Sequence, residues 1–378
     1  MAEWIDCKIA DLGTVIGGAT PSTKRLEYYE NGSIAWITPK DLSTFRGRYI
    51  RRGERNITEI GLKSCSTQLL PKNTVLFSSR APIGYIAIAE NELCTNQGFK
   101  SVIPNENTDP LFLYYLLKYN KNKIESMGSG TTFKEVSGNT LKNIVVSVPR
   151  DKKVQEQISS ILGAIDDKIE ANEKINNNLA QQAKTIYQAW FEKFILSNGS
   201  CPPTWKRGIL ADIANITSGK RPPNKSDKKM KGFEIPLVGA TSIVGFTNKA
   251  NYINKILVIG RVGTHGVIQR INSPCWASDN TLVMTSNLYE YTYQVLQKID
   301  YRAMNRGSTQ PLITQADMNK VDILIPDNQT LHEFELIVGQ LMQMYETNLI
   351  ENTKLAELRD YLLPRLISGE LDISKVNI

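Results

Sequence analysis

Two long stretches of the chain carry apolar residues at spacings of three or four, the pattern of an amphipathic helix. Each pattern continues for about four heptads, as in a coiled coil. The positions are Ile158, Ile161, Ile165, Ile169, Asn172, Ile175, Leu179, Ala183, Ile186 and Trp190 in the first, and Leu331, Phe334, Val338, Leu341, Tyr345, Asn348, Asn352, Leu355, Leu358 and Leu362 in the second. We predict two long helices that pack on each other. The alternative is that each apolar face is buried separately in a domain core.

Asn172 and Asn348 both fall on these apolar faces. A polar residue on such a seam lowers stability but fixes the register of the two helices. A helix of about 40 residues is about 60 Å long. Two such helices, packed antiparallel, form a stiff rod that sets a fixed separation between whatever is attached to it.

The rest of the chain shows short runs typical of strands, punctuated by Gly and Pro. These runs are 75–79, 85–89, 144–148, 256–260, 281–285 and 322–326. Apolar patterns at 109–126 and 289–304 predict one further helix in each half. The order is that of an α+β protein and differs from the strict strand–helix alternation of a nucleotide-binding sheet.

The two halves of the chain repeat the same order of blocks. The segment "WIDCKIADLGTVIGGATPS" (4–22) aligns with "WKRGILADIANITSGKRPP" (205–223), which places Asp11 on Asp212 and Gly18 on Gly219. The segments 75–86 and 257–268 also align, with Arg80 placed over Arg261. Residues 130–149 match 307–326, with Thr131 placed near Ser308. We predict an internal duplication with a pseudo-twofold axis, divided into globular domain 1–150, helix 151–197, globular domain 198–326 and helix with tail 327–378.

Charge separates the globular segments from the helical ones. Residues 1–150 and 195–326 together carry a formal charge of +13, whereas residues 151–194 and 327–378 together carry −6. Basic surfaces on globular domains suit a polyanion, because Lys and Arg bound to phosphates release counterions. The charge therefore favours DNA as the ligand. The plain alternative is a mildly basic protein with no such ligand.

The chain lacks the motifs of an active site. It contains no GxxxxGK[ST] phosphate loop, no GxGxxG that follows a strand and opens a helix, and no Asn-Pro-Pro-aromatic tetrapeptide of an adenine methyltransferase. Two histidines and five scattered cysteines give no metal framework. We expect no catalytic residue, metal or cofactor in this chain. With no apolar run of membrane-spanning length and no signal peptide, we expect a cytoplasmic protein without a membrane partner.

Candidate DNA contacts are the Arg, Lys, Ser, Thr, Gln and His residues of the polar loops, because these side chains bind phosphates and base edges. Arg80 and Arg261 stand out because they recur in both halves, although an arginine that ties down a loop would recur as well. The predicted set is Lys24, Arg25, Arg46, Arg48, Arg51, Arg52, Ser79, Arg80, Thr131, Thr132, Lys134, Lys220, Arg221, Lys225, Arg261, His265, Arg306, Ser308, Thr309 and Gln310.

Candidate partner contacts are the aromatic and leucine residues near the ends of the two helices. A large apolar, aromatic-rich patch often marks a protein interface. The alternative is that these side chains close the ends of the coiled coil itself. The predicted set is Ile186, Trp190, Phe191, Tyr361, Leu362, Leu363 and Leu366.

These motifs resemble the specificity subunit of a type I restriction–modification system over essentially the whole chain. The resemblance lies in the opening pattern "W…L.D…I..G..P" and the closing pattern "L..I.V.VP" of each half. It is most specific in "IDDKIEANEKINNNLAQQAKTIYQAWFEKF" (165–194) and "LRDYLLPRLISGELDI" (358–373), which look like the central spacer and the C-terminal tail of that family.

The resemblance implies that the two globular domains are target-recognition domains, each of which reads one half of an asymmetric bipartite sequence in double-stranded DNA. The two helices would be spacers that dock two methyltransferase subunits and, through them, restriction subunits. S-adenosylmethionine, Mg²⁺ and ATP would bind only to those partners. A stand-alone bipartite DNA-binding adaptor, an enzyme fused to a recognition domain and a coiled-coil scaffold are the competing interpretations.

Overall fold

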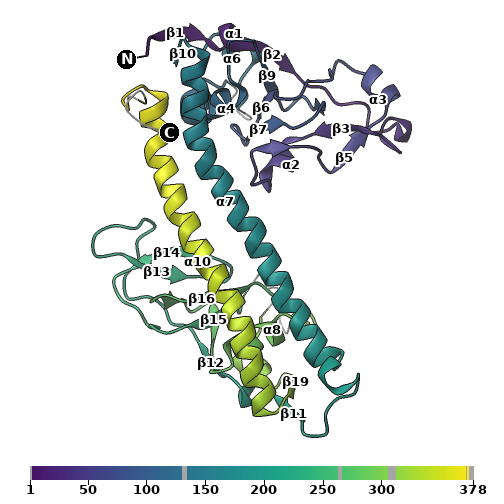
Figure 1. The fold of residues 1–378 in the computed structure, drawn as a ribbon, viewed down its shortest axis with the longest axis vertical. Helices are drawn as coiled ribbons and strands as arrows, with labels where there is room; N and C mark the ends of the chain where they lie inside the picture. Colours follow the sequence, from purple (N-terminus) through teal and green to yellow (C-terminus); the bar gives the residue numbers. More distant parts are fainter. Residues whose placement is uncertain (1, 130–133, 263–265, 305–311, 372, 374–378) are drawn as a thin grey trace. The chain divides into compact units, whose positions relative to one another are not determined.

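The computed structural model describes residues 2–129, 134–262, 266–304, 312–371 and 373. The chain divides into two compact units. Unit 1 comprises residues 1–173 and 349–378, and unit 2 comprises residues 174–348. Each long helix contributes one half to each unit, because α7 (Lys152–Tyr187) and α10 (Asn328–Ile367) both run through the boundary (Figure 1). The four predicted segments are therefore grouped into two units that share both helices.

Unit 1 is built on a five-stranded sheet of order β2-β9-β6-β7-β4, with a three-stranded sheet β5-β3-β8 and a pair β1-β10. The strands are β1 (Trp4–Lys8), β2 (Gly13–Gly17), β3 (Ile34–Ile37), β4 (Tyr49–Ile50), β5 (Arg55–Ile57), β6 (Val75–Phe77), β7 (Ile86–Ala89), β8 (Cys94–Thr95), β9 (Lys100–Pro104) and β10 (Val145–Pro149). The helices are α1 (Ile9–Leu12), α2 (Pro39–Ser43), α3 (Glu59–Lys63), α4 (Pro110–Tyr119), α5 (Lys121–Ser126) and α6 (Gly138–Lys142).

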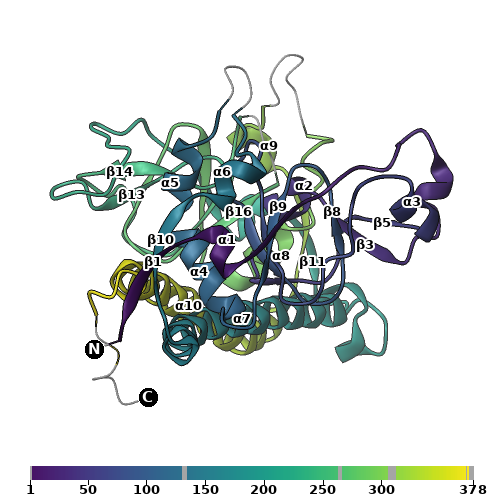
Figure 2. The same ribbon diagram turned by 90° about the horizontal axis from the view of Figure 1, so that it is seen from above.

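Alternation along the central strands of unit 1 produces two cores, one on each face of the sheet. Val75 and Phe77 of β6 lie in a cluster with side chains of α4 and of the unit 1 halves of α7 and α10. Figure 2 shows the ribbon of α4 next to that of α7. Leu76, between them, packs into the cluster on the opposite face.

Unit 2 has the same plan with fewer strands: a four-stranded sheet β12-β18-β15-β16, a three-stranded sheet β14-β13-β17 and a pair β11-β19. Here Leu257 and Ile259 of β15 face the helices, and Val258 faces the other core. The elements are β11 (Lys206–Ile209), β12 (Asn215–Ser218), β13 (Ile235–Val238), β14 (Ile243–Thr247), β15 (Ile256–Gly260), β16 (Ile268–Ile271), β17 (Trp276–Ala277), β18 (Thr281–Thr285), α8 (Tyr289–Leu296), α9 (Gln315–Asn319) and β19 (Asp322–Ile325).

The predicted duplication is confirmed element by element. Asp11 caps the first turn of its unit by accepting the N–H of Lys8 at 2.7 Å, and Asp212 accepts the N–H of Ile209 at 2.8 Å. The first strand of each unit pairs antiparallel with the last, β1 with β10 and β11 with β19. In both units the three-stranded sheet contains one parallel pair, β3 with β8 and β13 with β17.

All six strand-like runs of the sequence form strands. The two predicted short helices differ from their predicted ranges: the first is split into α4 and α5 but reaches Ser126 as predicted, and the second ends early. The first breaks at Asn120, whose side chain donates to the Leu116 carbonyl at 2.9 Å and so competes with the helical pattern. The second ends at Leu296, followed by a hydrogen-bonded turn in which Lys298 N–H donates to Val295 O.

The long helices pair antiparallel within each unit. In unit 1, Asn172 of α7 is fully buried and donates to Asn352 of α10 at 2.8 Å. In unit 2, Asn348 of α10 donates to Asn176 of α7 at 2.9 Å. The prediction of packed helices with asparagines on the seam is confirmed.

Two predicted seam positions are wrong: Ile175 and Leu358 are 44% and 46% exposed. Buried Asn176 and the largely buried Arg359 occupy the seam beside them. A pattern with a period of 3.5 drifts around a helix with a period of 3.6, so one-residue errors in such a stripe accumulate. Among the described residues, no helix is long and apolar enough to cross a membrane.

Candidate nucleic-acid interface

Four loops of unit 1 meet at one end of its five-stranded sheet, which we call the loop edge of unit 1. Hydrogen bonds join them: Ser79 N–H donates to Gly98 O at 2.7 Å, Val136 N–H to Ser79 O at 2.8 Å, and Ala19 N–H to Thr95 O at 3.1 Å. The described parts of these loops are residues 18–25 after β2, 78–85 after β6, 96–99 before β9 and 134–137 before α6.

Unit 2 forms the equivalent loop edge with the same hydrogen bonds. Lys220 N–H donates to Ala277 O, Arg261 N–H to Asn280 O and Ile313 N–H to Arg261 O, each at 3.0 Å. The described parts of its loops are residues 219–225 after β12, 261–262 and 266–267 after β15, 278–280 before β18 and 312–314 before α9. The fold therefore brings distant basic loops together once in each unit.

Most of the described DNA-binding candidates are solvent-exposed, and several lie at a loop edge. Those at a loop edge include Arg80 and Lys134 in unit 1 and Arg221 in unit 2. Arg261 is half-buried there. The exposed candidates are Lys24, Arg25, Arg46, Arg51, Arg52, Arg80, Lys134, Lys220, Arg221 and Lys225. Thr131, Thr132, His265, Arg306, Ser308, Thr309 and Gln310 lie outside the described residues.

Arg51 and Arg52 are not brought to the loop edge. They follow β4 at the other end of the sheet, where Glu90 N–H donates to Ile50 O at 3.0 Å. Arg80 does lie at the loop edge, and its Nε donates to Glu135 at 3.0 Å. Part of the positive charge of Arg80 is therefore balanced within unit 1.

Two of the predicted DNA contacts need correction because the side chains are buried and bound internally. Arg48 is 4% exposed, and its guanidinium contacts Asp167 and Glu170 of α7, with Nε 3.0 Å from Glu170 Oε1. Burial alone would lower the pKa of Arg48, but these hydrogen bonds to carboxylates raise it and keep it charged. Ser79 is fully buried, and its hydroxyl donates to Gly98 O at 3.2 Å.

The predicted match of Arg80 with Arg261 is also wrong by one residue. The hydrogen bonds of the two loop edges make Ser79 the equivalent of Arg261. The backbone N–H of each donates to the turn before the next strand, and the backbone carbonyl of each accepts from the segment before α6 or α9. Arg80 therefore corresponds to Val262. Gly84 and Gly266, which correspond without a gap, both adopt a positive φ, of 88° and 83°.

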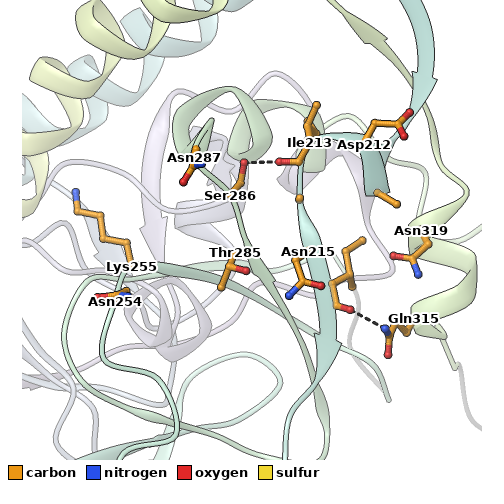
Figure 3. Close-up of a pocket in the computed structure, with 13 residues that line it drawn as sticks. Asp212, Ile213, Asn215, Asn254, Lys255, Thr285, Ser286, Asn287, Gln315 and Asn319 are labelled. Carbon is orange, nitrogen blue, oxygen red and sulfur yellow. Dashed lines mark hydrogen bonds between the residues drawn. The ribbon is translucent and has the colours of Figure 1, made fainter.

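One polar hollow of unit 2 lies at the other end of the same strands. Figure 3 shows this pocket of about 620 Å³ between the start of β12, the end of β18 and α9. Ser286 donates to Ile213 O and Gln315 donates to Ile216 O, each at 2.6 Å, so part of its polar lining is already bound. A second pocket, of about 730 Å³, lies at the loop edge and includes Arg221, Lys225 and Asp279.

Most predicted partner contacts are buried within their own unit. Phe191 belongs to the aromatic core of unit 2, with its ring 4.9 Å from Tyr291, and Leu363 and Leu366 belong to the main core of unit 1. These three predictions need correction, because the side chains close the helix ends internally. Ile186, Trp190 and Leu362 are partly buried against the same cores. Tyr361 is 57% exposed.

Two candidate functional residues cannot be identified from side-chain type alone. Gln97 and Asp279 occupy equivalent exposed positions at the two loop edges, between strands β8 and β9 and between β17 and β18. A single glutamine or aspartate in a polar loop carries no sequence signal, and only the matched offset of the two halves could have paired them. Among the described residues, no group of histidine, cysteine and acidic side chains could hold a metal ion.

The duplicated α+β units, the shared antiparallel helices and the paired basic loop edges define a two-part DNA specificity protein. Residues 1–181 and 202–360 match the family model described as the type I restriction modification DNA specificity domain. The chain belongs to this family of type I restriction–modification specificity subunits.

Relatives of known name support this assignment over nearly the whole chain. The type I restriction enzyme MjaIX specificity subunit of Methanocaldococcus jannaschii is 33% identical, over 99% of this chain and 95% of its own length. The HindI specificity subunit of Haemophilus influenzae is 21% identical, over 98% of this chain and all of its own length. A crystal structure of the S subunit from M. genitalium has the same fold, with a TM-score of 0.64 and 19% identity over 97% of this chain and 96% of that one.

Proposed function

We propose that this specificity subunit recognises an asymmetric, interrupted sequence in double-stranded DNA and reads one half with the loop edge of each unit. The observation that carries the proposal is the duplicated loop edge, whose hydrogen-bonded frame is the same twice while its exposed side chains differ. A shared backbone arrangement suits the same docking mode on DNA in both units, and different exposed side chains suit the recognition of different bases.

The long helices support a fixed separation between the two halves of the target. Each unit holds a stretch of both helices through a buried asparagine pair, which favours a single register. Because each long helix is continuous through the unit boundary, we expect the helix pair to set the distance between the two half-sites. An unread gap of constant length between the two halves of the target is therefore part of the proposal.

Two methyltransferase subunits are the proposed protein partners, and restriction subunits would join through them. The exposed apolar side chains on α10 support a docking surface, namely Leu349, Ile350, Leu358 and Tyr361 in unit 1 and Leu336 and Met344 in unit 2. S-adenosylmethionine, Mg²⁺ and ATP are proposed to bind to these partners. The proposed site of action is the cytoplasm.

Long-read methylome sequencing of the source cell, with this chain present and deleted, tests the proposal. The expected result is one split, asymmetric motif that loses methylation on deletion. Exchange of residues 1–150 for those of another specificity subunit should then change one half of the motif only. If deletion changes no methylation while the methyltransferase subunits are expressed, the chain is not the reader, and a stand-alone adaptor is the better description.

A further inference from the structure

One four-residue turn recurs at both loop edges and is held by the same bonds. In unit 1, Phe99 N–H donates to Asn96 O, Asn96 N–H to Ile37 O and Ser79 N–H to Gly98 O. In unit 2, Thr281 N–H donates to Ser278 O, Ser278 N–H to Val238 O and Arg261 N–H to Asn280 O. The turns 96–99 and 278–281 are thus fixed by the neighbouring strand and by the loop after β6 or β15.

A glycine brings a third segment against each turn. A Cβ atom on Gly18 would lie 2.3 Å from Asn96 O, and one on Gly219 would lie 2.0 Å from Ser278 O. Only glycine permits this approach, which places the loop after β2 or β12 directly beside the turn. The backbone of the turn is therefore held rigidly from three sides in each unit.

The second residue of each turn points its side chain to solvent from this rigid frame, and it differs between the units. It is Gln97 in unit 1 and Asp279 in unit 2, and both are exposed. The hydroxyl of Thr20 donates to Gln97 Oε1, which orients the amide. At the position equivalent to Thr20, unit 2 has Arg221, which lines the same pocket as Asp279.

We infer that Gln97 and Asp279 are base-reading residues, one for each half of the DNA target; this rests on the proposed function. With Oε1 held by Thr20, the Nε2 group of Gln97 is free to donate to N7 or O6 of a purine, and the second lone pair of Oε1 can accept from adenine N6. The Asp279 carboxylate accepts only, so it fits the exocyclic amine of cytosine or adenine. Arg221 beside it supplies donors for a neighbouring guanine or phosphate.

The test uses the full chain in complex with its methyltransferase subunits. Each complex selects from a library of random DNA duplexes, and sequencing of the bound fraction gives the preference at every position. Asp279→Asn should reduce discrimination about 10- to 100-fold at one position of one half-site. Gln97→Ala should do the same at one position of the other half-site. Asp322→Asn and Gln68→Ala, which change exposed side chains elsewhere, are the matched controls.

The outcomes separate this inference from the proposed function. If the wild-type complex selects no split motif, the proposed function fails. If the wild type selects one and both variants select it with unchanged discrimination, Gln97 and Asp279 do not read bases. Equal weakening on all sequences would instead assign them to backbone binding and overturn the inference. An unfolding temperature equal to that of the wild type shows, for each variant, that the turn still folds.

Discussion

Asn172 donates its side-chain amide to Asn352 at 2.8 Å across the two long helices of unit 1. The same amide group also donates to Glu351 at 2.7 Å. Asn176 and Asn348 form the corresponding pair in unit 2, at the same sequence offset from Asn352 and Asn172. Each unit thus contains one hydrogen-bonded asparagine pair between the two long helices. An all-apolar seam would let the helices shift in register at this place.

Replacement of Asn172 by Leu is expected to destabilise unit 1 by about 1–3 kcal/mol, because Asn352 and Glu351 lose a buried partner. The Asn172→Leu/Asn352→Leu double variant should recover much of this loss, since both sides of the seam then become apolar. Urea unfolding of the two single variants and the double variant measures the coupling. Simple additivity of the single effects would show that the two asparagines act independently.

Removal of the Arg270 side chain should unfold unit 2 far more readily than removal of an exposed arginine. Arg270 is largely buried and contacts Glu290 at 2.6 Å and Glu346 at 2.9 Å, with Tyr289 and Tyr293 on its guanidinium. Arg270→Met leaves the buried Glu290 without its cation, whereas Glu346 keeps Lys255 at 3.3 Å, and should cost about 3–5 kcal/mol.

The control for Arg270→Met is Arg25→Met, because Arg25 forms an ion pair with Glu27 on the surface of unit 1. Its expected effect is below about 1 kcal/mol. Chemical denaturation with hydrogen exchange as the local readout compares the two variants. Equal effects would mean that the Arg270 cluster contributes nothing beyond a surface pair.

Glu335 should make the stability of unit 2 depend on pH. Its carboxylate accepts the N–H groups of Glu290 and Tyr291 at 3.1 and 2.8 Å, at the start of α8. Burial raises the pKa of Glu335 to about 7, against the opposing effect of these hydrogen bonds. Glu290 faces it and also raises the pKa, whereas Arg270 lowers it.

Because the folded pKa of Glu335 lies above the ordinary value of 4.5, folding favours the protonated acid. The stability that this proton contributes is complete below about pH 4.5 and is lost as the pH rises through about 7. The loss is at most about 3 kcal/mol. Glu335→Gln removes the titration, so the stability difference between wild type and variant should change between pH 5 and pH 8. A constant difference over that range would refute the shift.

Truncation after Leu355 is expected to unfold unit 1 and leave unit 2 folded. The removed residues include Leu363, Leu366 and Ile367 of the main core, and Arg359, which contacts Asp166 at 2.8 Å. The resemblance of residues 358–373 to the family's C-terminal tail suggests instead that such a truncation would remove only a docking segment. Hydrogen exchange of the truncated chain distinguishes the two: retained protection in β6 and β9 would support the tail interpretation.

Exposed positions give a cleaner test of partner docking than truncation. Leu358→Ser/Tyr361→Ser alters side chains that are about half exposed, at 46% and 57%, so unit 1 should keep its unfolding temperature. Co-purification with the methyltransferase should fall at least about tenfold if this face is the docking surface. Leu26→Ser, at another exposed apolar residue of unit 1, is the matched control.

The parts of the fold that follow from periodic patterns could be predicted from the sequence. The repeat of Asp11 and Asp212, the two long helices and the asparagine seam all rest on spacing, which the chain displays directly. Spacing alone did not locate the register at Ser79 and Arg261, because a gap of one residue moves the alignment without changing the pattern.

The burial of individual polar side chains could not be predicted. Arg48 looks like any other arginine in a basic loop, and its partner Glu170 lies 122 residues away in the sequence. The pairing of β4 with β7 brings Arg48 to α7, and no local property of the loop reveals that pairing. The equivalence of Gln97 and Asp279 follows from the hydrogen bonds of the two turns, and neither side chain has a local sequence signal.

The boundary between the units has a genetic consequence. Unit 2 is encoded by one uninterrupted run of codons, 174–348, whereas unit 1 needs codons from both sides of that run. A crossover pair beside the asparagine codons at 172–176 and 348–352 would transplant a whole folded unit and keep both members of each asparagine pair in the same unit. Recombination at these two places could therefore exchange one recognition unit for another in a single event, with no new hydrophobic core to evolve.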